Sequence, residues 1–286
     1  MIVVTGATGQ LGRHVVRQLL EKVPATEIAV AVRNPGKAEG YAAQGITVLE
    51  ADYTKPATFE TALANADKVL LISSSEVGQR AAQHRAVVEA AKKAGVKHLV
   101  YTGILHSETS TMVLAREHQE TEALIRESGL PYTFLRNGWY TENYTDHVAG
   151  ALAQGAVYGA AGQGRIDAAS RADFAAAAVA VLTTAGHDNR SYELAGAPGF
   201  TLAEYAAEVA RASGKPVVYT NLPVDGFAAA LIQAGLPEGF AKILADCDAG
   251  IERGELADTS GDLARLVGRP STPWQETVAA ALRAPA

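Results

Sequence analysis

Three glycines, Gly6, Gly9 and Gly12, follow the first apolar run of the chain at intervals of three residues. The run covers residues 2–5, and residues 10–22 after it have the spacing of an amphipathic helix. The first N–H groups of such a helix are unpaired and partly positive, so a diphosphate can lie against them where no side chain intervenes. We therefore predict a dinucleotide-binding loop, with a purely structural turn as the alternative, made of Gly6, Ala7, Thr8, Gly9, Gln10, Leu11 and Gly12.

Each glycine of this loop has a separate expected task. Gly6 permits the tight turn, Gly9 lets the backbone approach the phosphates, and Gly12 lets the helix pack closely on the strand. The spacing is G-x-x-G-x-x-G, one residue longer than the common G-x-G-x-x-G form.

The end of the second apolar run, residues 28–33, indicates which dinucleotide is bound. NAD sites usually have an acidic residue there, about 20 residues after the glycines, for the ribose 2′-hydroxyl. This chain has Arg33, with Lys37 nearby. A guanidinium suits a 2′-phosphate, so we expect NADP(H); the alternative is that Arg33 is only a solvated strand end.

Polar residues also follow the third and fourth apolar runs, residues 46–52 and 68–75. The carboxyl ends of parallel strands meet at one edge of a sheet, so these residues should lie near a bound dinucleotide. Asp52 would lie beside the adenine or would cap the next segment. The serines would line the nicotinamide half of the site or merely start a loop; they are Ser73, Ser74 and Ser75.

The fifth run, residues 97–103, ends in Thr102 and Gly103. Thr102 is expected to bind a carbonyl oxygen or the ribose, and Gly103 to let the backbone approach the cofactor. The sixth run, residues 132–137, leads into an amide and two flat apolar faces, which suit a planar substrate ring above the nicotinamide. The alternative is an aromatic hinge that packs two domains together; the residues are Asn137, Gly138, Trp139 and Tyr140.

Short apolar runs alternate with helical patterns through residues 1–137. Apolar runs of this kind indicate parallel strands buried on both faces. We predict an α/β fold, a Rossmann-type doubly wound parallel sheet with a smaller α/β C-terminal domain. Residues 1–150 would bind NADP(H) and residues 151–286 would complete a substrate cleft. The second domain is either one block or discontinuous, with the helix near residues 171–186 packed back on the sheet.

Composition narrows the classes of partner. The 286 residues carry a net charge of −6 without any block of Lys and Arg, so a nucleic acid is not expected as a partner. Cys247 is the single cysteine, which excludes an internal disulfide and a cysteine-based metal site, and it is expected to be a small buried residue. No other metal-ligand spacing is seen. We expect no membrane span and a cytoplasmic location, because structured sequence begins at residue 2.

Several segments together resemble one family. The motifs "VTGATGQLG", "AVRNP", "EADYTKP", "VLLIS", "AGVKHLVYTG", "SGLPYTFLRNGWYTENY", "SRADFAAAAVAVLT" and "YELAG" are similar to those of the NmrA-like branch of the atypical short-chain dehydrogenase/reductase family. Within that branch the chain most resembles bacterial NADPH-dependent quinone oxidoreductases, and triphenylmethane dye reductases look nearly as similar. The resemblance implies NADPH as cofactor, a cleft between two domains, and hydride transfer to a quinone without a flavin.

The chain departs from the wider family at the catalytic pair. Short-chain dehydrogenases commonly use Tyr-x-x-x-Lys to pass a proton to a carbonyl, and the matching positions here are Leu114 and His118. A quinone or a cationic dye accepts hydride readily. The product takes protons from water or needs none immediately, so either substrate fits better than a sugar or steroid. His118 is a candidate proton donor, or one half of a surface pair with Glu122. A redox sensor without turnover, and a homodimer, are further hypotheses.

Overall fold

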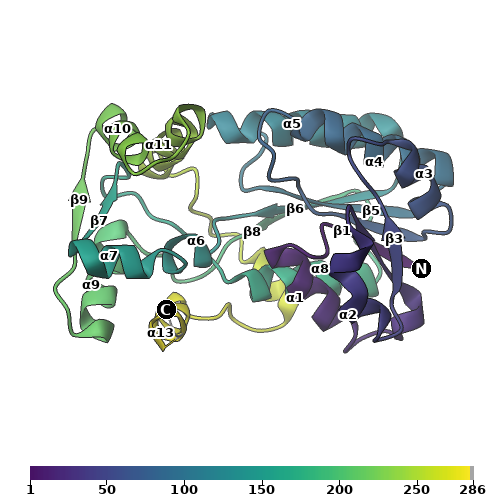
Figure 1. Cartoon of the computed structure of the whole chain (residues 1–286), viewed down its shortest axis with the longest axis horizontal. Coiled ribbons are helices and arrows are strands. Elements are labelled where there is room, and N and C mark those ends of the chain that lie inside the picture. Colours follow the sequence, from purple (N-terminus) through teal and green to yellow (C-terminus); the bar gives the residue numbers. More distant parts are fainter. Residues whose placement is uncertain (284–286) are drawn as a thin grey trace.

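A central sheet of seven parallel strands organises the computed structural model, which describes residues 1–283. The strand order is β3-β2-β1-β4-β5-β6-β8, so the direction of winding reverses between β1 and β4 (Figure 1). Ligands of doubly wound sheets bind at the carboxyl edge near such a switch point. The strands are β1 Ile2–Thr5, β2 Ile28–Val32, β3 Thr47–Glu50, β4 Lys68–Leu71, β5 His98–Ile104, β6 Tyr132–Asn137 and β8 Arg190–Leu194.

Helices cover both faces of the sheet, because alternate apolar side chains of its strands point to opposite sides. Val4, Val30 and Leu70 belong to the core under one helix layer, and Val3 and Leu71 to the core under the other. Figure 1 shows the two layers above and below the strands. One layer contains α3 Ala57–Leu63, α4 Arg80–Ala94 and α5 Val113–Ser128; the other contains α1 Gln10–Leu19, α2 Glu39–Ala42, α8 Arg171–Thr183 and α12 Asp262–Val267.

A smaller α/β part lies beyond the carboxyl edge of the sheet, on the left of Figure 1. Its two strands form a separate parallel sheet, and its apolar side chains form a third core cluster that includes Phe200 and Trp274. Its elements are α6 Glu142–Thr145, α7 Val148–Gln154, β7 Ala156–Gly159, α9 Leu202–Ser213, β9 Val218–Asn221, α10 Val224–Gln233, α11 Glu238–Glu252 and α13 Trp274–Arg283.

The fold class is confirmed, but a single division at residue 150 does not describe the chain. Strand β8 pairs with β6 from Thr133 to Asn137 and forms the seventh strand of the large sheet. Helices α8 and α12 also pack on the part with the large sheet. The sequence predicts this for α8 but not for α12. The sequence pattern could not show this return, because β8 is a half-exposed edge strand whose pairing partner is distant in the chain.

The predicted strand at residues 68–75 ends at Leu71, four residues early. Cys247 is buried, as expected, and burial raises the pKa of its thiol to about 12. Of the helices described, none has the length and apolar character that crossing a membrane requires.

Candidate active site

The glycine loop has the geometry of a phosphate cradle. Gly6 adopts a left-handed backbone conformation (φ +60°), and the N–H of Gly9 donates to its carbonyl oxygen at 2.9 Å. A Cβ on Gly12 would lie 2.3 Å from that oxygen and 2.6 Å from the Cα of Ala7, so only glycine fits. Gly9 is exposed and caps α1 without a side chain, which leaves the first amides of the helix open to an anion. These residues fit a dinucleotide diphosphate.

Two side chains hold this loop from outside. The hydroxyl of Tyr41 donates to the carbonyl of Ala7 at 3.0 Å, and Nε of Arg13 donates to the carbonyl of Thr8 at 3.0 Å. The loop is therefore shaped before any ligand binds.

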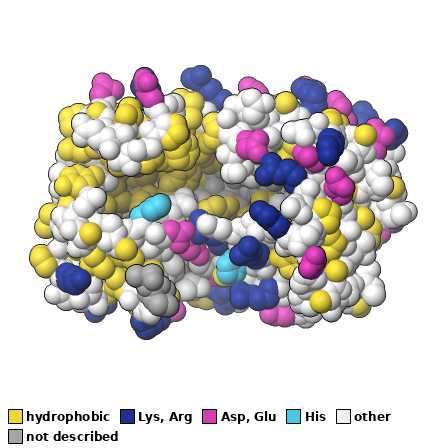
Figure 2. Space-filling view, in the orientation of Figure 1, with side chains coloured by type: hydrophobic (Ala, Val, Ile, Leu, Met, Phe, Trp, Pro, Cys, Tyr) yellow, Lys and Arg dark blue, Asp and Glu magenta, His cyan; other side chains and the backbone are white. Residues whose placement is uncertain are grey.

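Arg33 lies directly after β2 with 72% of its side chain exposed, and it is 3.7 Å from Glu76. It is therefore able to turn toward a ligand phosphate. Figure 2 shows a hollow between the two parts of the molecule, lined on one side by apolar side chains, with Lys and Arg side chains gathered on the side of the large sheet. A cationic margin of this kind suits a cofactor with several phosphates.

Asp52 already has hydrogen-bond donors close to it in the chain. Its Oδ1 accepts from the backbone N–H of Thr54 at 2.9 Å and from the Thr54 hydroxyl at 2.8 Å. Those two bonds lower the pKa of the Asp52 carboxyl. Asp52 thus stabilises the turn that follows β3, but it does not cap α3, whose N-terminus has no side-chain cap. An adenine contact stays a prediction.

Thr102 is buried and its hydroxyl oxygen accepts the N–H of Ser73 at 2.9 Å. The hydroxyl thus fixes the start of the serine segment, which consists of Ser73, Ser74 and Ser75. Ser75, at its end, is exposed. Gly103 is expected to let the backbone approach the cofactor. However, a Cβ added to Gly103 would lie 3.4 Å from Oε1 of Glu122, on the side of the sheet that α5 covers.

His118 and Glu122 both lie on the buried face of α5, so the surface pair of these two residues is wrong. Its Nδ1 lies 2.7 Å from the hydroxyl of Tyr101, and its Nε2 lies 3.2 Å from a guanidinium nitrogen of Arg80. Burial, and then the charge of Arg80, hold the pKa of His118 well below its usual value. Both ring nitrogens are engaged, which suits a positioning role better than proton donation to a substrate.

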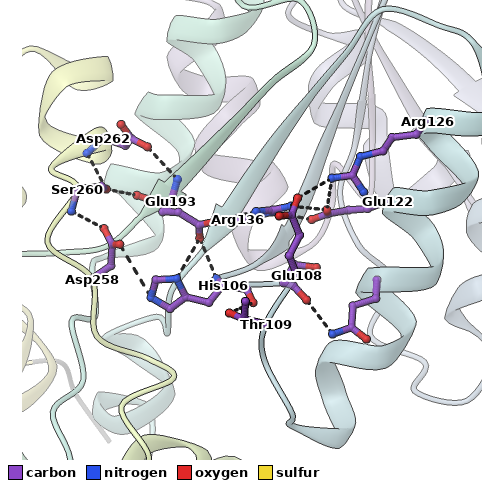
Figure 3. A network of polar contacts seen from close by, with 12 residues as sticks. His106, Glu108, Thr109, Glu122, Arg126, Arg136, Glu193, Asp258, Ser260 and Asp262 are labelled. Atoms are coloured by element: carbon purple, nitrogen blue, oxygen red, sulfur yellow. Dashed lines mark hydrogen bonds and ion pairs between the residues drawn. The ribbon is translucent and has the colours of Figure 1, made fainter.

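Glu122 instead pairs with Arg136, the residue of β6 that precedes Asn137 (Figure 3). The guanidinium of Arg136 also reaches Glu108 at 2.7 Å and Glu193 of β8 at 2.9 Å. The hydrogen bond from Arg136, together with its charge, lowers the pKa of Glu108. This network ties α5, β6 and β8 together under the end of β6.

The segment after β6 joins both halves of the molecule. Trp139 packs against the core of the smaller part, whereas the ring of Tyr140 meets Phe174 of α8 edge-on at 5.4 Å between centroids. The guanidinium of Arg171 lies 5.1 Å above the Tyr140 ring. This packing matches the hinge alternative, and the two aromatic rings remain only partly buried. A substrate contact for them stays a prediction.

Asn137 and Gly138 are buried at the start of the same segment. Gly138 donates to the carbonyl of Leu194 at 2.7 Å, and a Cβ there would crowd two carbonyl oxygens. Asn137 Oδ1 is buried without a hydrogen-bond partner among residues 1–283. A buried acceptor left unpaired is costly, so this oxygen is a candidate to accept a donor from a bound ligand.

Two residues of α4 lie under the segment of Ser73, Ser74 and Ser75. The sequence favours a solvated helix face for Arg80 and His84, with a phosphate or ribose contact of Arg80 as the alternative, yet both residues are buried. Nε of Arg80 donates to the carbonyl of Ser74 at 2.7 Å, and Nε2 of His84 accepts the N–H of Ser74 at 3.0 Å. Their position four residues apart on one helix face was the available signal.

Comparison with known proteins agrees with this geometry. A family model described as NAD(P)H-binding matches residues 6–185. The chain is 54% identical over 278 residues to quinone oxidoreductase 2 of Escherichia coli, with 97% of each chain covered. A crystal structure of an NADPH-dependent quinone oxidoreductase from Escherichia coli, complexed with NADPH, superposes with a TM-score of 0.96 at 53% identity, covering 98% of this chain and 99% of that one. Triphenylmethane reductase of Citrobacter sp., complexed with NADP(H), gives 0.94 at 41% identity, with 98% and 100% covered.

Proposed function

Because the chain belongs to the NAD(P)H-binding family, we propose that it is an NADPH-dependent oxidoreductase that transfers hydride to a quinone without a flavin. The observation that carries this proposal is that a phosphate-binding loop occurs together with His118 in place of the usual catalytic lysine. Both ring nitrogens of His118 are already engaged by Tyr101 and Arg80. A quinone suits such a site, since its reduced product can take protons from water. The similarity to quinone oxidoreductase 2 along nearly the whole chain supports the same substrate class.

Each part of the site has a task in this reaction. The amides at the start of α1 bind the diphosphate, and Arg33 binds the 2′-phosphate. Asn137 Oδ1 accepts a hydrogen bond from the ligand, and Trp139 and Tyr140 lie beside the substrate ring and exclude water. NADPH, when bound, supplies the hydride. Rate enhancement then comes mainly from holding two rings in contact.

We propose that Thr102 and His118 contribute indirectly. Thr102 fixes the backbone of the serine segment through its hydroxyl, and His118 supports Arg80, which holds the same segment. Neither residue then needs to exchange a proton with the substrate.

The proposal is tested with purified, flavin-free protein, NADPH and a small water-soluble quinone. Oxidation of NADPH, followed by its absorbance, should be faster than with NADH and should yield the quinol in equal amount. Turnover only after flavin is added, or none with any quinone, would contradict the proposal.

A second candidate keeps the chemistry and changes the acceptor to a triarylmethane dye. It is favoured by the match to the Citrobacter triphenylmethane reductase. Parallel assays with a quinone and a cationic dye separate the two through kcat/KM. Tight NADPH binding without oxidation of either would instead indicate a redox sensor.

Location and assembly are also part of the proposal. A cytoplasmic protein is supported by the buried free thiol of Cys247, which suits a reducing compartment.

The proposed homodimer is tested by light scattering. A monomeric mass across the working concentration range would contradict the homodimer.

A further inference from the structure

Three successive peptide N–H groups after β4 are bound by side chains instead of by a neighbouring strand. The N–H of Ile72 donates to the hydroxyl of Thr5 on β1 at 3.1 Å, and that of Ser73 to Thr102 on β5 at 2.9 Å. The N–H of Ser74 donates to Nε2 of His84 on α4 at 3.0 Å. The segment lies where the sheet winding reverses, so β1 no longer supplies backbone partners there.

The bonds around His84 define its tautomer. The hydroxyl of Thr121 donates to the carbonyl of Glu117 at 2.8 Å, so its oxygen accepts from Nδ1–H of His84 at 2.9 Å. Nε2 therefore keeps its lone pair and can accept the N–H of Ser74. Burial, together with the charge of Arg80, lowers the pKa of His84 to about 3, and the ring stays neutral.

Arg80 holds the carbonyl group of the same residue, Ser74. Its Nε donates to the carbonyl of Ser74 at 2.7 Å, and its guanidinium lies 3.8 Å from Glu117 of α5. Oε1 of Glu117 in turn accepts the N–H groups of Gly78 at 3.0 Å and of Arg80 at 3.2 Å. Both backbone groups of Ser74 are thus fixed by α4, and α5 fixes the start of α4.

We propose that His84 and Arg80 are positioning residues, which hold residues 73–75 in the conformation that receives the cofactor. The inference rests on the proposed function only for its use of NADPH, not for the acceptor. A segment held in its binding conformation before the ligand arrives loses less conformational freedom on binding. Loss of either side chain should weaken NADPH binding while the affinity for the quinone is kept.

The test compares His84→Leu with His84→Gln by calorimetric titration with NADPH alone. Glutamine places Oε1 where Nε2 stood, so it keeps the acceptor for the N–H of Ser74, whereas leucine leaves that N–H buried and unpaired. We expect the Kd of NADPH to rise about tenfold in His84→Leu and to stay within about threefold of the original in His84→Gln. The exposed neighbour variant Arg85→Leu is the matched control and should not change the Kd.

Two further measurements keep the test decisive. The KM for the quinone should be unchanged in His84→Leu at saturating NADPH, a split that general loss of structure would not give. If His84→Leu does not fold, Arg80→Leu and Arg80→Lys repeat the comparison at the carbonyl of Ser74, with lysine keeping a charged donor. Equal Kd values for His84→Leu and His84→Gln, or for Arg80→Leu and Arg80→Lys, would overturn the proposal. A failure of quinone turnover alone, with these Kd differences present, would count against the proposed reaction and not against this inference.

Discussion

Glu122 and Arg136 form a buried two-bond ion pair beneath the end of β6. Nε and Nη2 of Arg136 donate to the two carboxylate oxygens of Glu122 at 2.9 and 2.7 Å. The side chains of Arg136 and Glu122 are only 6% and 1% exposed. Removing one partner of such a pair leaves the other charge buried without full compensation.

Glu122→Gln should lower the free energy of unfolding by about 1.5–3 kcal/mol, the range of hydrogen bonds to charged groups, because Arg136 keeps its bonds to Glu108 and Glu193. The measurement is urea unfolding at pH 7. Glu120→Gln, two residues away on the exposed face of α5, is the control and should change little. A loss below about 1 kcal/mol in Glu122→Gln, the range of exposed pairs, would show that the pair matters less than its burial implies.

Arg33→Ala should remove most of the preference for NADPH. Hydrogen bonds to a charged group are worth about 1.5–3 kcal/mol, so the Kd of NADPH should rise roughly 10- to 100-fold while that of NADH stays the same. Fluorescence titration with each dinucleotide gives both constants. A parallel loss for both dinucleotides would mean that Arg33 does not contact the 2′-phosphate.

Gly12→Ala should disturb the loop, since the new Cβ would lie 2.3 Å from the carbonyl oxygen of Gly6. We expect about 1–3 kcal/mol of destabilisation together with weaker NADPH binding. Gly150→Ala in α7 is the matched control, because its Cβ meets nothing within 4 Å, and it should stabilise by about 0.5–1 kcal/mol. Thermal unfolding of both variants checks the contrast, and similar Tm values would contradict it.

Trp139→Ala should raise the KM for the quinone by about 2- to 10-fold, the equivalent of one aromatic contact. The Kd of NADPH should remain within about twofold of the original. Trp139→Phe keeps an aromatic face, so its KM for the quinone should be close to that of the original protein. An effect of Trp139→Ala on Tm alone, with the quinone KM unchanged, would leave the residue only its packing role.

Stability should fall with acid partly through Glu255. Burial tends to raise the pKa of this carboxyl, but hydrogen bonds from Ser110, Arg253 and Thr111 outweigh it and lower the pKa to about 2, from an ordinary value of 4.5. A carboxyl whose pKa is lower in the folded than in the unfolded protein stabilises the fold at pH values above the unfolded-state pKa. That stability is lost as the pH falls from the unfolded-state pKa to the folded-state pKa. Glu255→Gln should therefore cost stability at pH 7 and progressively less below pH 4.5.

Urea unfolding of Glu255→Gln at pH 7 and at pH 3.5 measures this difference. The exposed Glu89→Gln serves as the reference. A cost of Glu255→Gln that does not change between the two pH values would mean that its carboxylate is not the stabilising form.

The first half of the fold was predictable because its signals are local. The apolar runs at residues 2–5 and 132–137 correspond to β1 and β6, and Gly95 and Gly129 end α4 and α5 in the left-handed conformation expected of helix-terminating glycines. The return of β8 to the sheet depends on a partner strand more than 50 residues earlier, which no local pattern contains.

The site was predictable at its edge and not beneath it. The glycine loop follows from the glycine spacing together with the apolar run before it and the helical pattern after it. In contrast, His84, Arg80 and His118 look like solvated helical residues until α4 and α5 are placed against each other. Their burial depends on a helix pair and on the serine segment above them. The absence of a Tyr-x-x-x-Lys pair could be seen in the sequence. The contacts of both His118 ring nitrogens with Tyr101 and Arg80 could not.

Hydride transfer to a quinone is tested most directly by a single turnover in a stopped-flow instrument. Flavin-free protein saturated with NADPH is mixed with less than one equivalent of a small quinone, and the fluorescence of the reduced nicotinamide is followed. We predict a single fast phase whose amplitude equals the quinone added and whose rate falls when the transferable hydrogen is deuterium. Unchanged fluorescence, with NADPH still bound, would contradict hydride transfer to quinones by this protein.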